Sequence, residues 1–282
     1  MRLGTWVATR TIDERYEPEI RTVTFPDLRE AVEAGFDDFK AAPTQMLALG
    51  VIYPLVGLAA ARHAAGSGLL PMVYPLVAGL SLLGPAVALG LYEISRRREA
   101  GSDVSWLDAF AVLRSRSLLA VAELGAILFA VFIAWLFAAR TIYGLTIGAG
   151  MSETPLAFAT TVLTTPQGWA LIFVGNAVGL VFAAVVLAIS VVSFPMMLDR
   201  NVGAMMAVRT SLRVVRRNPG TMAAWGLLVA LALVAGSLPA FVGLAVVVPI
   251  LGHATWHLYR RAVRAERRSA GFKWSGGTHF AA

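Results

Sequence analysis

Residues 169–198 read WALIFVGNAVGLVFAAVVLAISVVSFPMML, thirty consecutive residues without a charged side chain. About 20 mostly apolar residues are enough for a helix to cross the roughly 30 Å hydrocarbon core of a bilayer. The stretch therefore predicts a membrane-spanning helix. Its surplus length predicts either a tilted helix or an end, Met196–Leu198, that projects beyond the bilayer.

Five more apolar stretches surround this one, so we expect six spans, at Thr44–Ala61, Leu70–Ile94, Leu118–Ala139, Trp169–Leu198, Thr221–Leu238 and Ala240–Leu258. Apolar residues make up 57% of the chain and charged residues only 15%, against about 25% in soluble domains, which excludes a soluble globular protein. The sequence thus predicts an all-α polytopic membrane protein, with an N-terminal tail at 1–26, a membrane domain at 27–261 and a basic C-terminal tail at 262–282.

The placement of arginine predicts the orientation. Of the 24 Lys and Arg residues, 22 fall in the N-terminal region, the second-to-third connection, the fourth-to-fifth connection or the C-terminal tail, and the other two are Arg62 and Arg140. Because positively charged loops stay in the cytoplasm, both termini are expected there. The basic cytoplasmic segments are also expected to attract anionic lipid.

Three cytoplasmic segments place apolar residues at helical spacing opposite a basic face. They are Asp27–Lys40 with Leu28, Val32, Phe36 and Phe39, Trp106–Arg116 with Trp106, Phe110 and Leu113, and Gly203–Arg217 with Met205, Val208, Leu212 and Val215. The pattern is typical of an amphipathic helix in the membrane interface, although an arginine-rich loop scores in the same way. Because one such segment precedes each pair of spans, we expect three pseudo-repeats.

A second match supports the repeat: Pro85–Arg97 and Pro249–Arg261 place a proline, an aromatic residue, a polar residue and two arginines at the same offsets. Three strings, RTVTFPDLREA at 21–31, SFPMMLDR at 193–200 and PILGHATWHLYRR at 249–261, resemble a family of uncharacterised six-spanning bacterial integral membrane proteins. The resemblance covers roughly residues 20–265. It implies a six-span architecture and an inner-membrane location, and it implies no particular activity.

Ionisable side chains inside a span are costly and are candidate sites. Glu123, in the third span, is expected to face the bundle interior as a helix-pairing group or as a proton or substrate site, unless it reaches the interface. His253 and His257 lie four residues apart on one face of the sixth span, which suits hydrogen bonds to neighbouring helices, a metal, or a haem or quinone contact. Since no His-Glu-x-x-His string and no cysteine is present, we expect no metal and no cofactor.

Three further residues, Glu93, Asp199 and His257, occupy matched positions at the ends of spans two, four and six. Each is followed by an arginine: Arg96, Arg200 and Arg260. Packed around an axis, they would form a polar ring at the cytoplasmic mouth, serving either as a substrate vestibule or as ion pairs that finish three helices. Asn176, inside a GxxxG string of the fourth span, is expected to bond across a close helix contact.

No Ser-His-Asp or Cys-His set lies on one side of the expected membrane, so the sequence favours a non-enzymatic protein. The leading hypothesis is an accessory, assembly or lipid-organising component, with a larger membrane complex as its candidate partner. One alternative is a small transporter or channel with a polar site near Glu123 and the cytoplasmic helix ends. Another is a redox subunit that contacts haem or quinone. The basic charge comes without an aromatic-basic module, so nucleic acid is not an expected partner.

Overall fold

A computed structural model gives the fold. It describes residues 18–41, 70–148 and 154–264, together with positions 50, 51, 54, 55, 57–59 and 62. Within these ranges the secondary structure is helical, apart from turns, loops and an isolated antiparallel bridge between Ile20 and Val263. The all-α class is therefore confirmed.

Four helical stretches are long and apolar enough to cross a membrane: Val73–Glu99, Leu118–Thr146, Pro166–Arg200 and Pro219–Ser237. They correspond to the second, third, fourth and fifth expected spans. The first, 44–61, lies mostly outside the described residues. The sixth is helical as α13 (Leu244–Ala262), but polar side chains in its C-terminal half keep it out of this set. Six spans and three pseudo-repeats remain predictions.

Prolines divide two of these stretches. The second consists of α4 (Val73–Leu80), α5 (Gly84–Val87) and α6 (Leu89–Glu99), with a 3₁₀ turn at Ser81–Leu83 four residues before Pro85. The fourth consists of α9 (Pro166–Ser190) and α10 (Ser193–Arg200), and the break at 191–192 lies just before Pro195. A proline cannot donate to the carbonyl four residues back and its ring clashes with that carbonyl, so the helix is interrupted there.

The break places Met196–Leu198 in the separate helix α10, and all three residues are buried in the protein core. Their position relative to the bilayer stays a prediction. Asn201 ends α10 in the left-handed conformation, at a φ of 51°, a common way to finish a helix.

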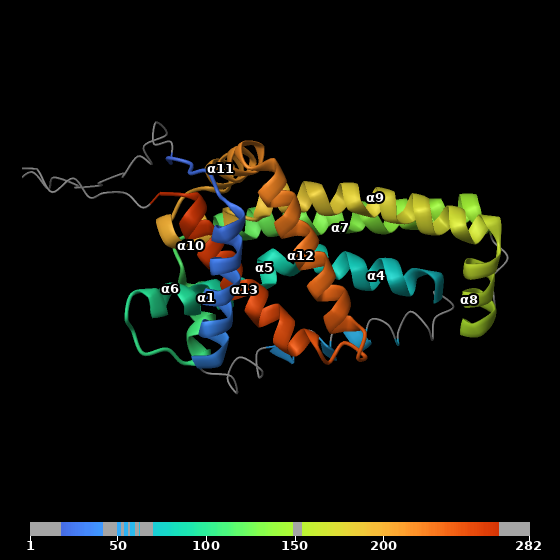
Figure 1. The fold of residues 1–282 in the computed structure, drawn as a ribbon, viewed down its shortest axis with the longest axis horizontal. Helices are drawn as coiled ribbons and strands as arrows, with labels where there is room; N and C mark the ends of the chain where they lie inside the picture. The colour runs from blue at the N-terminus through green and yellow to red at the C-terminus, as the bar shows by residue number, and fades with distance from the viewer. Residues whose placement is uncertain are drawn as a thin grey trace, which may run out of the picture.

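The helices form a compact end and a projecting arm (Figure 1). In the arm, α7 (Leu118–Thr146) and α9 lie side by side, and α8 (Pro155–Thr164) crosses their far ends. At the opposite end, α1 (Phe25–Ala41), α6 and α10 gather around the C-terminal half of α13, and α11 (Ala204–Arg217) packs beside α10. We call this the polar end. From the polar end α12 (Pro219–Ser237) extends outward, and α13 runs back toward the polar end.

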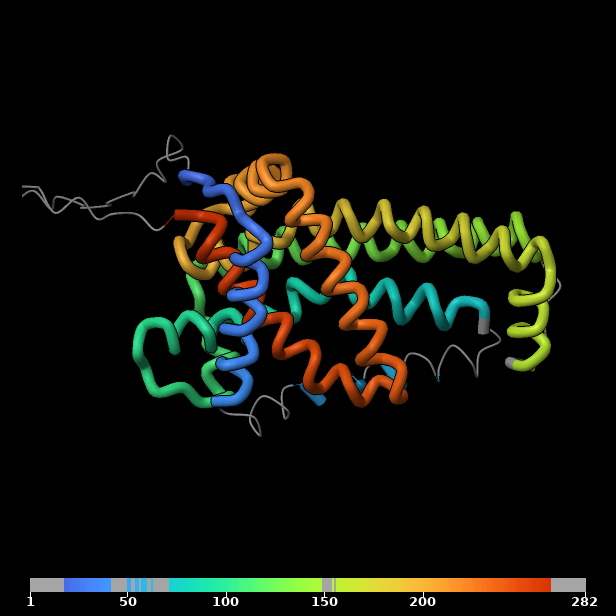
Figure 2. Tube along the Cα trace, viewed as in Figure 1, coloured from blue at the N-terminus to red at the C-terminus, as the bar shows by residue number. Residues whose placement is uncertain are grey.

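The two ends of the described chain meet at the polar end, as the blue and red segments of Figure 2 show. The Arg21 amide donates to the Ala262 carbonyl at 2.9 Å, and the Arg264 amide donates to the Glu19 carbonyl at 3.1 Å. Residues 18–23 and 262–264 are therefore held antiparallel on one side of the molecule.

The three segments expected as interfacial helices are α1, the 3₁₀ helix η3 (Trp106–Arg114) and α11. The face of α1 that packs on the protein consists of Leu28, Ala31, Gly35, Asp38 and Phe39, whereas Phe36 is 46% exposed. The expected face of η3 (Trp106, Phe110 and Leu113) is exposed. The small side chains of α1 allow a close approach to α13, which large apolar residues would prevent.

Candidate functional site

The C-terminal half of α13 organises the polar end. His253 and His257 reach toward α1 and α6, while Trp256, Tyr259 and Arg260 reach toward the ends of α6 and α10. Because α13 turns by about 100° per residue, this half of the helix presents polar groups to two neighbours at once. The candidate site therefore has two parts, a cluster around Asp38 and a cluster around Asp199.

Asp38, on α1, lies at the centre of the first cluster, and its residue is only 7% exposed. Its carboxylate accepts hydrogen bonds from His257 Nε2 at 2.9 Å and from Ser95 Oγ at 2.6 Å. The Arg98 Nε lies 3.0 Å from the other carboxylate oxygen. One carboxylate thus joins α1 to both α13 and α6.

His253 extends this cluster into the core. It is fully buried, and its Nδ1 lies 2.7 Å from Ser95 Oγ and 3.8 Å from Asp38. The Ser95 hydroxyl has one proton, which it donates to Asp38, so the proton between His253 and Ser95 comes from Nδ1. The result is a relay of hydrogen bonds from His253 through Ser95 to Asp38.

Two opposing effects act on the pKa of Asp38. Burial raises it, but the hydrogen bonds from His257 and Ser95 and the nearby histidines outweigh burial, so the pKa is held below its ordinary value. The cluster therefore holds Asp38 as a carboxylate at neutral pH.

The second cluster joins α13 to α6 and α10. Asp199 accepts from the Tyr259 hydroxyl at 2.5 Å and from Arg260 Nη1 at 3.1 Å. Arg260 Nε also donates to Glu99 at 3.0 Å, and Glu99 accepts from the Trp256 indole at 3.0 Å. Two carboxylates from different helices are thus bridged by one arginine.

The ring expected from the matched helix ends is formed only in part. Asp199 and Arg260 pair across two helices, as expected of such a ring. Glu93 instead binds the arginines of its own helix, Arg96 at 2.7 Å and Arg97 at 2.7 Å. His257 turns to Asp38. Arg200 donates to the Tyr259 hydroxyl at 3.1 Å and to the Arg264 carbonyl.

Two predicted site residues belong to neither cluster. Glu123, in the second turn of α7, is exposed on the outer face of the helix, which corrects the expectation that it faces the bundle interior. Close to the start of α7, a carboxylate reaches the interface more cheaply than it would at mid-membrane. Asn176 does bond across helices as expected, accepting from the Tyr74 hydroxyl of α4 at 2.9 Å.

In the GxxxG string around Asn176, one of the two glycines lies at a close helix contact. A Cβ on Gly179 would lie 3.2 Å from the Trp135 ring of α7, whereas a Cβ on Gly175 would meet nothing within 4 Å. Trp135 fixes this contact, because its indole donates to the Pro75 carbonyl of α4 at 2.7 Å. The close contact between α7 and α9 in the arm therefore consists of the Trp135 ring packed against Gly179.

Sequence reasoning missed Asp38 and Ser95. A usable signal was present in Ala31 and Gly35, since two small residues four apart predict close packing of helices. Asp38 falls one turn further along the same face. Within the described part of the chain, no group of three His, Cys, Asp or Glu side chains is placed to hold a metal ion.

The long apolar helices, with their polar groups gathered at one end, define a polytopic helical integral membrane protein. Residues 73–199 match a family model described as "Predicted integral membrane protein (DUF2189)", a family of unknown function. The expected resemblance is thereby confirmed over a shorter range than residues 20–265. No match was found among curated proteins or among solved structures.

Proposed function

We propose that this protein is a non-enzymatic accessory component of a bacterial inner membrane, with six spans and both termini in the cytoplasm. The observation that carries the proposal is the internal pairing of the polar end. Asp38, Glu93, Glu99 and Asp199 are each held by cations or donors of the same chain. Groups committed to one another in this way stabilise a helix assembly and are not available to a substrate.

The exposed apolar surface supports the same proposal. Large side chains on the arm point outward from α7 and α9, among them Phe129, Phe137, Phe173 and Leu180, each more than half exposed. In a membrane such a surface contacts lipid or the helices of a partner, so an arm that extends past its own bundle favours assembly with a larger complex. Glu123 and Asn176, the residues expected along a transport path, lie on exposed faces.

The proposal is tested by mass spectrometry of the protein tagged at its chromosomal locus, expressed at native level and purified in mild detergent. We expect a membrane complex to co-purify in constant stoichiometry, and to be absent from a purification of an untagged strain. Recovery of the protein alone, together with solute flux in proteoliposomes that depends on it, would overturn the accessory role.

The proposed topology has its own test, because the chain has no cysteine and every introduced thiol is unique. Single variants Ser67→Cys, Ser102→Cys and Thr160→Cys are treated in spheroplasts with a membrane-impermeant maleimide. We expect Ser67→Cys and Thr160→Cys to react in intact spheroplasts, and Ser102→Cys to react after permeabilisation. Labelling of Ser102→Cys from outside would contradict the orientation, and protection of Ser67→Cys would contradict the first span.

A further inference from the structure

The helix α11 has three distinct faces. The face that packs on the protein consists of Ala207, Ser211 and Val214. Along one edge lie the half-buried apolar residues Val208, Leu212 and Val215. The third face carries the exposed arginines Arg209, Arg213, Arg216 and Arg217. A helix in the membrane interface has this division, with apolar side chains toward the acyl chains and arginines at the level of the headgroups.

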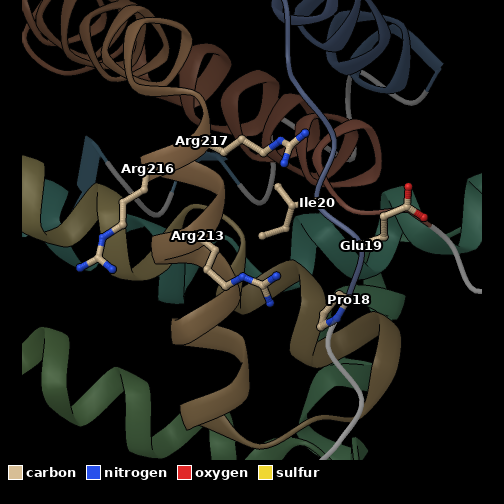
Figure 3. Close-up of a pocket in the computed structure, with 6 residues that line it drawn as sticks. All are labelled: Pro18, Glu19, Ile20, Arg213, Arg216 and Arg217. Carbon is tan, nitrogen blue, oxygen red and sulfur yellow. The ribbon is translucent and has the colours of Figure 1, made fainter.

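A pocket of about 530 Å³ lies between this arginine face and the segment Pro18–Ile20 (Figure 3). Arg213 and Arg217 extend toward the segment, while Arg216 points to the other side of the helix. The chain just after the segment is fixed by Asn218, which accepts from the Val23 amide at 2.8 Å and donates to the Arg21 carbonyl at 3.2 Å. The wall opposite the arginines is therefore held in place by hydrogen bonds.

The charge of this pocket is positive. The acidic residue that lines it, Glu19, is paired with Arg264 at 2.9 Å. Arg217 has no carboxylate partner among the residues that the structure describes, in contrast to Arg260 and Arg261, which are paired with acids. A guanidinium group without an acidic partner attracts an anion.

The position of the pocket relative to the expected membrane indicates which kind of anion it binds. Arg217 lies two residues before Pro219, the first residue of the apolar helix α12. The pocket is therefore within about one helical turn of the point where a candidate span begins, which is the level of lipid phosphates. Guanidinium groups bind phosphate oxygens through paired hydrogen bonds, a geometry that lysine lacks.

We propose that the pocket between α11 and Pro18–Ile20 binds the phosphate group of an anionic phospholipid, with Arg213 and Arg217 as its ligands and Arg216 at its rim. The inference rests on the proposed orientation, which places the polar end at the cytoplasmic surface. A free phosphate has the same chemistry, and the experiment separates the two sources. The thiol-labelling test of topology is independent of it, so the two failures are distinguishable.

The test measures lipid binding by native mass spectrometry of the delipidated full-length protein in detergent, titrated with phosphatidylglycerol or with phosphatidylcholine of the same chain length. We expect Arg213→Gln/Arg217→Gln to weaken phosphatidylglycerol binding about tenfold or more. The matched control, Arg114→Gln/Arg116→Gln, removes the same charge from another exposed basic segment and is expected to change binding less than twofold. Arg217→Gln alone gives an intermediate loss, and unchanged thermal unfolding shows that each variant is folded.

Equal losses in both double variants would overturn the proposal, because they would mean a diffuse basic surface without a site. Equal binding of the two lipids by the wild-type protein would also overturn it. Inorganic phosphate provides the remaining arm. If millimolar phosphate binds in an Arg217-dependent way and phosphatidylglycerol does not, the ligand is a free phosphate and the lipid assignment is wrong.

Discussion

Asparagine in place of Asp38 is expected to destabilise the docking of α1 on α13 by about 2–3 kcal/mol, because hydrogen bonds to charged groups are lost in a buried setting. The substitution keeps the shape of the side chain and removes its charge. It leaves Arg98 and His257, which lie 3.0 and 2.9 Å from the carboxylate, without their anion. Thermal unfolding in mild detergent, followed by tryptophan fluorescence, measures the loss. Trypsin cleavage at Arg29 and Lys40 reports whether α1 has separated.

The neighbouring residue provides the control. Asp37 is paired with Lys40 at 2.8 Å, but its side chain is 70% exposed. Exposed pairs of this kind contribute about 0.5 kcal/mol or less, so Asp37→Asn is expected to leave unfolding and cleavage almost unchanged. Equal effects of the two substitutions would mean that loss of charge on α1, and not the buried cluster, causes the change.

The same residue predicts a dependence on acid. Because the pKa of Asp38 is lowered in the folded protein, its contribution to stability is present above the ordinary carboxylate pKa of about 4. It is lost as the pH falls through the lowered folded value. The stability difference between the wild-type protein and Asp38→Asn should therefore be constant from pH 7 to 5 and close below about pH 4. A difference that stayed constant down to pH 3 would contradict this assignment.

The sequence predicts much of the fold because lipid allows few solutions. Long apolar runs must be helical, and four expected spans are found as helices of the required length and hydropathy. The balance of arginine predicts termini on one side, and the bridge between Ile20 and Val263 brings the two described ends together. Helix breaks are harder to predict from hydropathy, because hydropathy does not show that Pro195 cannot donate a hydrogen bond to the carbonyl four residues earlier.

The site is harder to predict, because its contacts join distant parts of the chain. The histidine face and the Asp199–Arg260 pair follow from helical spacing and matched offsets. Asp38 does not, because hydropathy ranks large apolar residues, whereas the contact face of α1 is built on small ones. Glu123 shows the opposite error. A charged residue in an apolar run suggests an interior partner, but the rotation of α7 places it outside.

Alanine in place of Gly35 is expected to separate α1 from α13, at a cost of about 1–3 kcal/mol or more. The added Cβ would lie 2.5 Å from the Ala254 amide nitrogen and 2.8 Å from its Cα. These are backbone atoms in the middle of a helix, so they cannot rotate away, and the two helices must move apart. Trypsin cleavage at Arg29 and Lys40 should accelerate, and the unfolding temperature in detergent should fall.

Gly125→Ala is the matched control, because a Cβ at Gly125, inside α7, would meet nothing within 4 Å. There alanine should be neutral or stabilising by up to about 1 kcal/mol, so only Gly35→Ala of the two is expected to destabilise the protein. Combining Gly35→Ala with Asp38→Asn gives the decisive measurement. Both substitutions act by separating α1 from α13. Once the helices have separated, removing the Asp38 charge breaks few further contacts, so the double variant should lose less stability than the sum of the two single variants. Fully additive costs would mean that the glycine contact and the Asp38 cluster stabilise the protein independently.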